Sequence, residues 1–314
     1  MAATRVVVAL GGNALSPSGG SGDVHEMRAA LAVTAAALAD LVEAGASLVI
    51  THGNGPQVGR ILLQQEYAAD RVPPMPMDVC GAQSQGQIGY LLAQTLDAEM
   101  VRRHLDTRAL CLVTQVVVNG RDPAFRRPTK PVGPSYDRPA AQRIAHETGY
   151  VFRIMPDKRW RRVVASPAPI RIVEAEPLRQ IVDAGHVVVA AGGGGVPVVA
   201  VGETMYGVEA VIDKDLTAAR LGLLVGADQL VILTEVARVQ TGFGTPEAQE
   251  LSRLSARQAK ALLRAGEFPD GSMKPKVQAC VDFVTGGGTR AVIGALAEAH
   301  DVVFGDAGTV VEAT

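Results

Sequence analysis

The sequence predicts an α/β fold, a three-layer α/β/α sandwich around a mostly parallel sheet, with a small protruding lid subdomain. Short runs of β-branched and other apolar residues alternate with longer segments that repeat apolar side chains at helical spacing. The strand segments are apolar without interruption, which is typical of parallel strands that helices cover on both faces. Glycine-rich turns follow several of them, at the sheet edge where such folds bind ligands.

Six segments are predicted as strands because they are short, apolar and rich in valine, isoleucine and leucine. In chain order they are residues 6–10, 47–51, 110–118, 186–191, 229–234 and 290–294. Between the first two, residues 24–44 place Met27, Leu31 and Leu38 near one face of a predicted helix, and Gly45 is its stop signal. Strands separated in this way by helices pair in parallel.

Residues 119–169 break the alternation, because they are rich in proline, arginine and glycine and contain only short apolar segments. A plain connection between elements has about 4–6 residues, so this stretch is predicted to form the lid subdomain over a cleft. The chain is otherwise predicted to be a single domain over residues 1–314. Its N-terminal lobe, with the lid, covers approximately residues 1–180 and its C-terminal lobe 181–314, with the boundary within residues 170–185.

The composition argues against several classes of protein. Of the 314 residues, 47% are hydrophobic and 20% charged, as in a packed domain. A net charge of −2 argues against a nucleic-acid partner, and no apolar run reaches the roughly 18 residues that span a membrane. Cys80, Cys111 and Cys280 form no CxxC pair, and the chain starts close to its first strand without a signal peptide, so a cytoplasmic location is expected.

Two glycine-rich turns and one charged tetrapeptide carry the functional signal. Gly11 and Gly12 follow the first strand, and four glycines at 192–195 follow the fourth. Such loops let backbone N–H groups approach phosphate oxygens closely. Lys214 then stands between two aspartates, in the sequence Asp-Lys-Asp-Leu at 213–216, as a fixed positive charge. Because phosphoryl transfer depends mostly on positioning and electrostatics, these residues predict a small-molecule kinase.

The common nucleotide-binding motifs are missing from the sequence. There is no GxxxxGK[ST] loop, no GxGxxG turn of a dinucleotide-binding unit and no protein-kinase catalytic loop. A dinucleotide oxidoreductase is therefore disfavoured, and the predicted phosphate site has a different design.

Taken together, the motif blocks resemble those of carbamate kinase, in the order of that family and over nearly the whole chain. The blocks are ALGGNAL at 9–15, THGNGPQVG at 51–59, DVCGAQSQG at 78–86, PTKPVGP at 128–134, WRRVV at 160–164, GGGGVP at 192–197, IDKDL at 212–216, and GSM at 271–273 with PK at 275–276. The first and last blocks alone would indicate the amino-acid-kinase fold. The HGNGPQVG, DVCGA and TKPxGP blocks make the resemblance specific to carbamate kinase.

The resemblance implies catalytic roles for three lysines and one aspartate. Lys214 and Lys276 would hold the phosphates across the transfer path, and Asp215 would orient both lysines. Lys130 would reach over the carbamoyl-phosphate side from the lid. Several fixed cations are a direct means of stabilising the charge that spreads over a transferring phosphoryl group.

The resemblance also implies two further groups of site residues. Those expected to bind the substrate and its phosphate are Gly11, Gly12, Asn13, Gly53, Asn54, Gly193 and Gly194. Those expected to bind the nucleotide are Asp213, Thr234, Glu235, Phe243 and Met273. Mg²⁺ would accompany ATP or ADP, with no metal ligand expected from the protein. A homodimer, and net ATP formation in the breakdown of arginine or related compounds, are expected in the same way.

Two regions depart from the pattern of the family. Glu235 replaces an aspartate, and Gln240 replaces an aromatic residue able to stack on a purine. Either adenine binds more weakly as a result, or Phe243 makes the base contact. Arg159 replaces a glycine in the lid. Two alternatives therefore stay open: a non-catalytic sensor of nucleotide or carbamoyl phosphate with the same fold, and a kinase of this fold that acts on another carboxylate.

Overall fold

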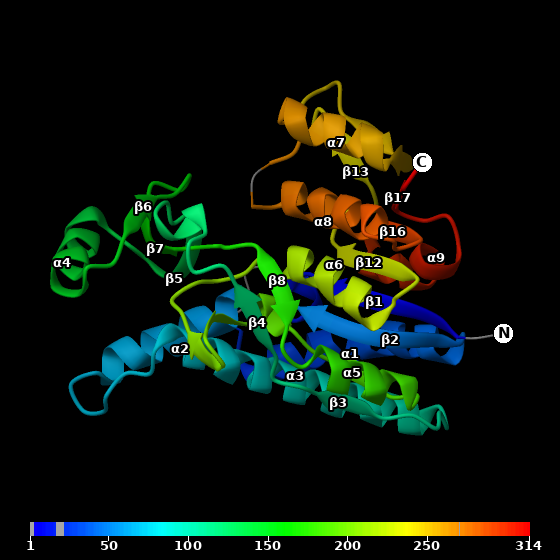
Figure 1. The fold of residues 1–314 in the computed structure, drawn as a ribbon, viewed down its shortest axis with the longest axis horizontal. Coiled ribbons are helices and arrows are strands. Elements are labelled where there is room, and N and C mark those ends of the chain that lie inside the picture. The colour runs from blue at the N-terminus through cyan, green and yellow to red at the C-terminus, as the bar shows by residue number, and fades with distance from the viewer. Residues whose placement is uncertain (1–2, 17–21, 270) are drawn as a thin grey trace.

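The computed structural model describes residues 3–16, 22–269 and 271–314, and its centre is an eight-stranded sheet (Figure 1). The strand order is β15-β17-β16-β12-β1-β2-β9-β3, and every pairing is parallel except that of β16 with β17. The strands are β1 (Thr4–Leu10), β2 (Ala46–His52), β3 (Ala109–Cys111), β9 (Val187–Val189), β12 (Gln229–Thr234), β15 (Arg253–Ser255), β16 (Arg290–Ala295) and β17 (Thr309–Glu312).

Helices cover both faces of this sheet, which confirms the predicted three-layer α/β/α sandwich (Figure 1). In β1, Val7 and Ala9 belong to one core, whereas Val6, Val8 and Leu10 belong to the other, as the alternation of strand side chains requires. The first core packs under α5 (Ala175–Asp183), α6 (Lys214–Val225), α7 (Ala256–Ala265) and α8 (Met273–Thr285). The second packs under α1 (Val24–Glu43), α3 (Met77–Arg102) and α9 (Ala299–Phe304).

The helix predicted over residues 24–44 is confirmed as α1. It begins after Asp23, whose carboxylate accepts hydrogen bonds from the backbone N–H groups of His25 and Glu26 at 2.7 and 3.0 Å. A cap of this kind contributes about 1 kcal/mol to helix stability, because it satisfies N–H groups that have no partner inside the helix. The residues predicted to face the core, Met27, Leu31 and Leu38, are all buried.

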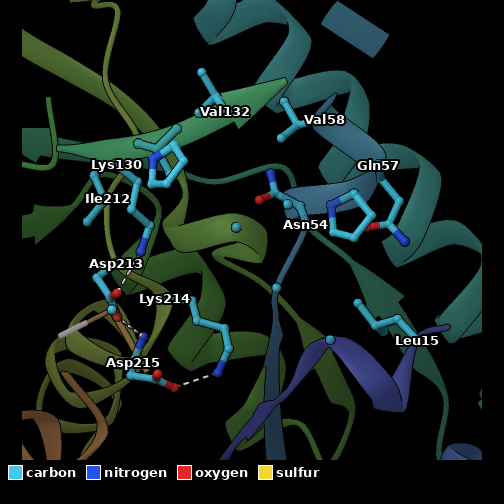
Figure 2. Close-up of a pocket in the computed structure, with 18 of the residues that line it drawn as sticks. Leu15, Asn54, Gln57, Val58, Lys130, Val132, Ile212, Asp213, Lys214 and Asp215 are labelled. Atoms are coloured by element: carbon cyan, nitrogen blue, oxygen red, sulfur yellow. Dashed lines mark hydrogen bonds and ion pairs between the residues drawn. The ribbon is translucent and has the colours of Figure 1, made fainter. Parts of the chain in front are cut away.

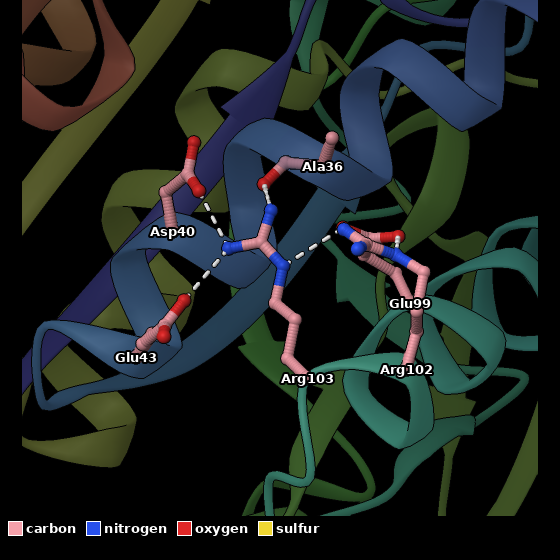
Figure 3. A network of polar contacts seen from close by, with 6 residues as sticks. All are labelled: Ala36, Asp40, Glu43, Glu99, Arg102 and Arg103. Carbon is pink, nitrogen blue, oxygen red and sulfur yellow. Dashed lines mark hydrogen bonds and ion pairs between the residues drawn. The ribbon is translucent and has the colours of Figure 1, made fainter.

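An arginine joins the ends of α1 and α3 on the outer side of the second core (Figure 3). The guanidinium of Arg103 contacts carboxylates from both helices: Asp40, Glu43 at 2.9 Å and Glu99 at 2.8 Å. Hydrogen bonds from Arg102 and Arg103 lower the pKa of Glu99 to about 2, so this carboxylate stays ionised at neutral pH. Charge-assisted contacts of one guanidinium with several carboxylates fix the geometry of the two helix ends.

Five of the six predicted strands are confirmed as β1, β2, β9, β12 and β16, but the single strand predicted at 110–118 is wrong. This segment forms β3 in the eight-stranded sheet and then β4 (Gln115–Val118) in another sheet. The chain turns away at Thr114, whose backbone N–H and C=O both bond to the buried side chain of Gln85, at 3.0 and 3.1 Å. The Gln85 amide thus satisfies the backbone N–H of Thr114, and the Thr114 carbonyl also accepts from the backbone N–H of Val196 at 2.8 Å.

Two smaller sheets flank the central one. The first has the order β11-β10-β4-β8, and the second, in the lid, has the order β5-β7-β6. The additional strands are β5 (Lys130–Tyr136), β6 (Phe152–Ile154), β7 (Trp160–Val164), β8 (Pro169–Ile172), β10 (Val196–Val201) and β11 (Thr204–Gly207), and a hairpin of β13 (Val239–Thr241) and β14 (Gln249–Leu251) follows β12.

Within residues 119–169, where the lid subdomain was predicted, β5, β6, β7 and α4 (Arg138–Thr148) protrude together from the main body (Figure 1). The bounds of the lid stay a prediction. The lid rests on α2 (Gly55–Ala68) at one side, where the hydroxyl of Tyr136 donates to Glu66 at 2.7 Å. At the other side the guanidinium of Arg162 pairs with Glu209 at 2.9 Å. Within the lid, Arg159 donates to the backbone carbonyl of Ser135 at 3.0 Å. The lid is thus held by polar contacts on both sides of its base.

The two halves of the chain share the eight-stranded sheet. Strand β1, from the N-terminal half, lies between β2 of the same half and β12 of the other half. Helix α5 occupies most of the stretch predicted to hold the lobe boundary, residues 170–185. The division into lobes stays a prediction, although the carboxyl ends of β1, β2, β9 and β12 meet at one edge, where the site described below lies.

Candidate functional site

A cavity of about 270 Å³ lies where loops of the central sheet meet the lid (Figure 2). The loops after β1, β2 and β9 contribute glycines, the lid contributes the start of β5, and α2, α6 and α8 contribute residues at or near their N-terminal ends. Residues from both halves of the chain therefore surround one space. The three predicted catalytic lysines, Lys130, Lys214 and Lys276, all line it together with Asp215.

Asp215 joins two of these lysines. One carboxylate oxygen accepts from Nζ of Lys214 at 2.5 Å and the other from Nζ of Lys276 at 2.8 Å, and the Asp215 residue is only 3% exposed. Burial opposes ionisation of this carboxyl group, but the ammonium groups of Lys214 and Lys276 outweigh it and lower the pKa of Asp215 below its usual range. Asp215 is therefore a carboxylate that holds two cations side by side at the cavity.

Burial acts in the opposite way on Lys214, whose pKa is lowered chiefly because its ammonium group is removed from water. The carboxylate of Asp215 opposes this shift, whereas the nearby charge of Lys276 adds to it. A cation held in this way has lost most of its own hydration and keeps only fixed protein partners. Such a group is well suited to stabilise a bound anion.

Lys130 reaches the same cavity from the lid and pairs with Asp213 across 2.9 Å. Asp213 also caps α6, because its other carboxylate oxygen accepts from the backbone N–H of Asp215 at 3.0 Å. One aspartate thus fixes both the start of α6 and the position of the lid lysine. With all three lysines protonated, three cations face two carboxylates, and the surplus positive charge lies next to a helix N-terminus that also favours anions.

The four-glycine turn has a conformation and a packing that exclude side chains. Gly193 and Gly194 have φ values of +67° and +93°, in the left-handed region that favours glycine. A Cβ atom on Gly193 would lie 2.2 Å from the side-chain nitrogen of Asn54, and one on Gly194 would lie 2.3 Å from the carbonyl oxygen of Ile212. The turn therefore packs directly against the loop after β2 and against the segment that leads into α6.

Hydrogen bonds to Ser84 and from His52 fix the loop after β2. The side-chain nitrogen of Asn54 donates to the hydroxyl of Ser84 at 2.8 Å, and that hydroxyl donates to the carbonyl of Gly81 at 2.6 Å. His52 is 1% exposed, and burial lowers its pKa to about 4, so it is neutral at pH 7. Its Nδ1 lies 2.8 Å from the carbonyl oxygen of Gly53, and donates to it. These contacts hold Gly53 and Asn54 at the cavity, in front of the first turn of α2.

Most of the residues predicted to bind substrate and phosphate come together here, and most of those predicted to bind the nucleotide do not. Gly12, Gly53, Asn54, Gly193 and Asp213 line the cavity, whereas Gly11, Asn13 and Gly194 belong to the same loops without lining it. Thr234, Glu235, Phe243 and Met273 also do not line it. Thr234 ends β12, Glu235 follows it, Met273 begins α8, and Phe243, after β13, is 64% exposed. Their nucleotide role stays a prediction.

Two functional candidates were missed by sequence reasoning. Ser84 fixes Asn54, and Gln57 lines the cavity from the first turn of α2. Both lie inside blocks that carry the resemblance, but burial and hydrogen bonding distinguish them from their neighbours, and neither property can be read from the sequence.

The described part of the chain offers no metal centre of its own, since no three histidine, cysteine, aspartate or glutamate residues in it gather suitably. Both aspartates of the cavity are bonded to lysines. In the same part of the chain, no helix has the length and apolar character needed to cross a membrane.

Known proteins resemble this chain from end to end. The amino acid kinase family matches residues 4–295. The carbamate kinase of Pyrococcus horikoshii is 44% identical and that of Halobacterium salinarum 46% identical, with 97% of this chain and 98% and 97% of those proteins aligned. The structure of the carbamate kinase of Giardia lamblia bound to AMP-PNP superimposes with a TM-score of 0.93 at 37% identity and covers 99% of both chains.

Proposed function

The chain belongs to the carbamate kinases of the amino acid kinase family, and on this premise we propose that it interconverts ATP and carbamate with ADP and carbamoyl phosphate. One observation of the structure carries the proposal. Lys130, Lys214 and Lys276 converge, with two aspartates that fix them, on a cavity that glycine-rich loops leave open to an anion. The match to the amino acid kinase family and the 44–46% identity to carbamate kinases confirm the resemblance predicted from the sequence blocks.

The arrangement supports direct transfer between the two substrates. An oxygen of carbamate attacks the γ-phosphorus of ATP, a new P–O bond forms, and the bond from that phosphorus to the bridging oxygen of ADP breaks. Lys214 and Lys276 lie close enough together to neutralise the oxygens of one phosphoryl group, while Asp215 keeps both oriented. No step requires a covalent bond to the protein.

The size of the cavity favours a small acceptor. A volume of about 270 Å³ lies slightly below the usual range for ligand sites, about 300–1,000 Å³, although it must receive both a phosphoryl group and its acceptor. Carbamate has four heavy atoms, whereas an amino-acid side chain would need further space. A small acceptor such as carbamate fits this space, and the preference for carbamate over a larger carboxylate rests on the similarity to carbamate kinases.

We propose that Mg²⁺ enters with ATP or ADP as part of the nucleotide substrate. The described residues provide no cluster of ligands, and the aspartates of the cavity are already bonded to lysines. Mg²⁺ in phosphoryl-transfer sites is commonly held by substrate phosphates with one or two carboxylates, so this arrangement is compatible with a metal that the nucleotide carries. The AMP-PNP complex of the Giardia enzyme supports an ATP-type nucleotide.

The deciding experiment is ATP formation from carbamoyl phosphate and ADP with Mg²⁺, measured with luciferase. The purified chain is expected to form ATP at a rate that depends on protein concentration, and to give no ATP when acetylglutamyl phosphate replaces carbamoyl phosphate. A folded protein that forms no ATP from carbamoyl phosphate, yet binds it or ADP in calorimetry, would instead be the non-catalytic sensor.

Lys130→Ala is expected to raise the KM for carbamoyl phosphate about tenfold and to leave the KM for ADP within twofold. The reason is that Lys130 reaches the cavity from the lid, next to Asp213, and removing one charge-assisted contact to a phosphate costs roughly one to two powers of ten in affinity. Steady-state kinetics with each substrate varied in turn measures both constants. An effect confined to the KM for ADP would contradict the assignment of Lys130 to the carbamoyl-phosphate side.

We also propose net ATP formation in the breakdown of arginine or a related compound, a cytoplasmic location and a homodimer. Three free cysteines, two of them buried, support a reducing compartment. For a chain of 32.7 kDa, light scattering is expected to give twice that mass, and a mass of one chain would contradict the dimer.

A further inference from the structure

One residue that lines the cavity carries a buried side-chain atom without a hydrogen-bond partner in the described part of the chain. The side-chain oxygen of Gln57 has no hydrogen-bond partner among the described residues, although the Gln57 residue is only 2% exposed. Three other buried side-chain atoms share this property, on Arg161, His186 and Gln229, but none of these residues lines the cavity. A buried acceptor without a donor is unfavourable, and a bound ligand that supplies the donor removes the penalty.

Gln57 also occupies a place where a small carboxylate would bind. It lies in the first turn of α2, after the segment Gly53-Asn54-Gly55-Pro56, which lines the cavity as well. The backbone N–H groups in the first turn of a helix have no partner inside the helix and favour an anion. In the view of Figure 2, Gln57 and Leu15 lie on the side of the cavity away from Lys214 and Asp215. The cavity thus has a side rich in cations for a phosphoryl group and another side with an unused acceptor.

The chemistry of the proposed substrate matches this acceptor. Carbamate and carbamoyl phosphate carry an NH₂ group, which donates hydrogen bonds, while their oxygens only accept. The lysines donate, and the carboxylates of Asp213 and Asp215 are held in ion pairs with them, whereas the Gln57 oxygen has no partner within the residues that the structure describes. The oxygen of Gln57 is the complementary partner.

We propose, on the basis of the proposed function, that Gln57 accepts a hydrogen bond from the NH₂ group of carbamate and carbamoyl phosphate. This contact makes Gln57 a specificity-determining residue. Acetate and acetyl phosphate have the same shape but carry a methyl group in place of NH₂, and they leave the buried oxygen without a donor. A site built around a buried hydrogen bond discriminates strongly against an analogue that lacks the matching group.

The test compares two phosphoryl donors with each variant. ATP formation from MgADP is measured with carbamoyl phosphate and with acetyl phosphate, and the ratio of the two kcat/KM values is the readout. Because both donors carry the same phosphate, general damage to the site cancels in this ratio. Gln57→Met is expected to lower the ratio by about 10–100-fold, chiefly through carbamoyl phosphate, since one buried hydrogen bond is lost. Gln64→Met, on the exposed side of the same helix, is the matched control and should leave the ratio unchanged.

A second variant tests which atom of the amide makes the contact. Gln57→Glu keeps an acceptor oxygen, so the ratio should stay within a few-fold of wild type even though its negative charge slows both reactions. A Gln57→Met variant that loses both activities equally would overturn the inference and leave Gln57 with a packing role. A wild-type ratio near one would also overturn it. Absence of ATP from carbamoyl phosphate in the wild type would instead refute the proposed function, so the two failures are distinguishable.

Discussion

Lys214→Ala is expected to lower kcat for ATP formation from carbamoyl phosphate by about 10²–10³-fold, the loss seen when one preorganised group that stabilises a transition state is removed. Lys214 is the lysine for which the structure gives the strongest case. Its side chain is 14% exposed, its ammonium group is bonded to Asp215, and burial has already lowered its pKa. A cation with so little water around it interacts strongly with charge that develops nearby.

The variant needs two comparisons to be informative. Lys260→Ala removes an exposed lysine from α7 and should change kcat by less than twofold. Lys214→Arg keeps the charge but not the compact ammonium group, and it should recover only part of the activity. Thermal unfolding of each variant separates lost chemistry from lost structure. A folded Lys214→Ala protein within a few-fold of the wild-type kcat would rule out the role assigned to this lysine.

The fold followed from the sequence wherever local pattern decides structure. Apolar strands and helical spacing were enough to predict the layers, because burial on both faces leaves a continuous apolar strand. The strand predicted at 110–118 was wrong for a non-local reason. At the break, the backbone of Thr114 bonds to Gln85, 29 residues away in the chain, and to the backbone N–H of Val196. A pattern read along the chain contains no information about such a partner.

In the site, as in the fold, the residue types can be read from the sequence, whereas contacts between residues far apart in the chain cannot. The charged residues of the tetrapeptide at 213–216 are evident from the sequence, but their partners are not. Asp213 pairs with Lys130, 83 positions away, and Asp215 pairs with Lys276, 61 positions away. Gln57 lies inside one of the matching blocks, but its buried oxygen, without a hydrogen-bond partner among the described residues, can be recognised only in the three-dimensional structure. The ion pairs and the burial of these residues, rather than their types alone, define the site.

Asp215→Ala is expected to destabilise the protein by about 3–5 kcal/mol, the cost of leaving a buried charge without its partner. Asp215 is the shared partner of the Lys214 and Lys276 ammonium groups, and their mutual repulsion is no longer compensated without it. The midpoint of thermal unfolding should fall by about 5–15 °C. Glu176→Ala, which breaks an exposed pair with Arg179, is the control and should change stability by less than about 1 kcal/mol.

The dependence of this loss on pH distinguishes an electrostatic cause from a simple cavity. Without Asp215, the folded-state pKa of Lys214 should fall further below the unfolded value of 10.5, because the carboxylate that opposed its lowering is gone. The unfolded chain then binds more protons than the folded one, and stability rises with pH up to that value. The difference in unfolding midpoint between wild type and Asp215→Ala should therefore shrink from pH 7 to pH 9.5. A difference that is constant over this range would show that lost packing, not unpaired charge, destabilises the variant.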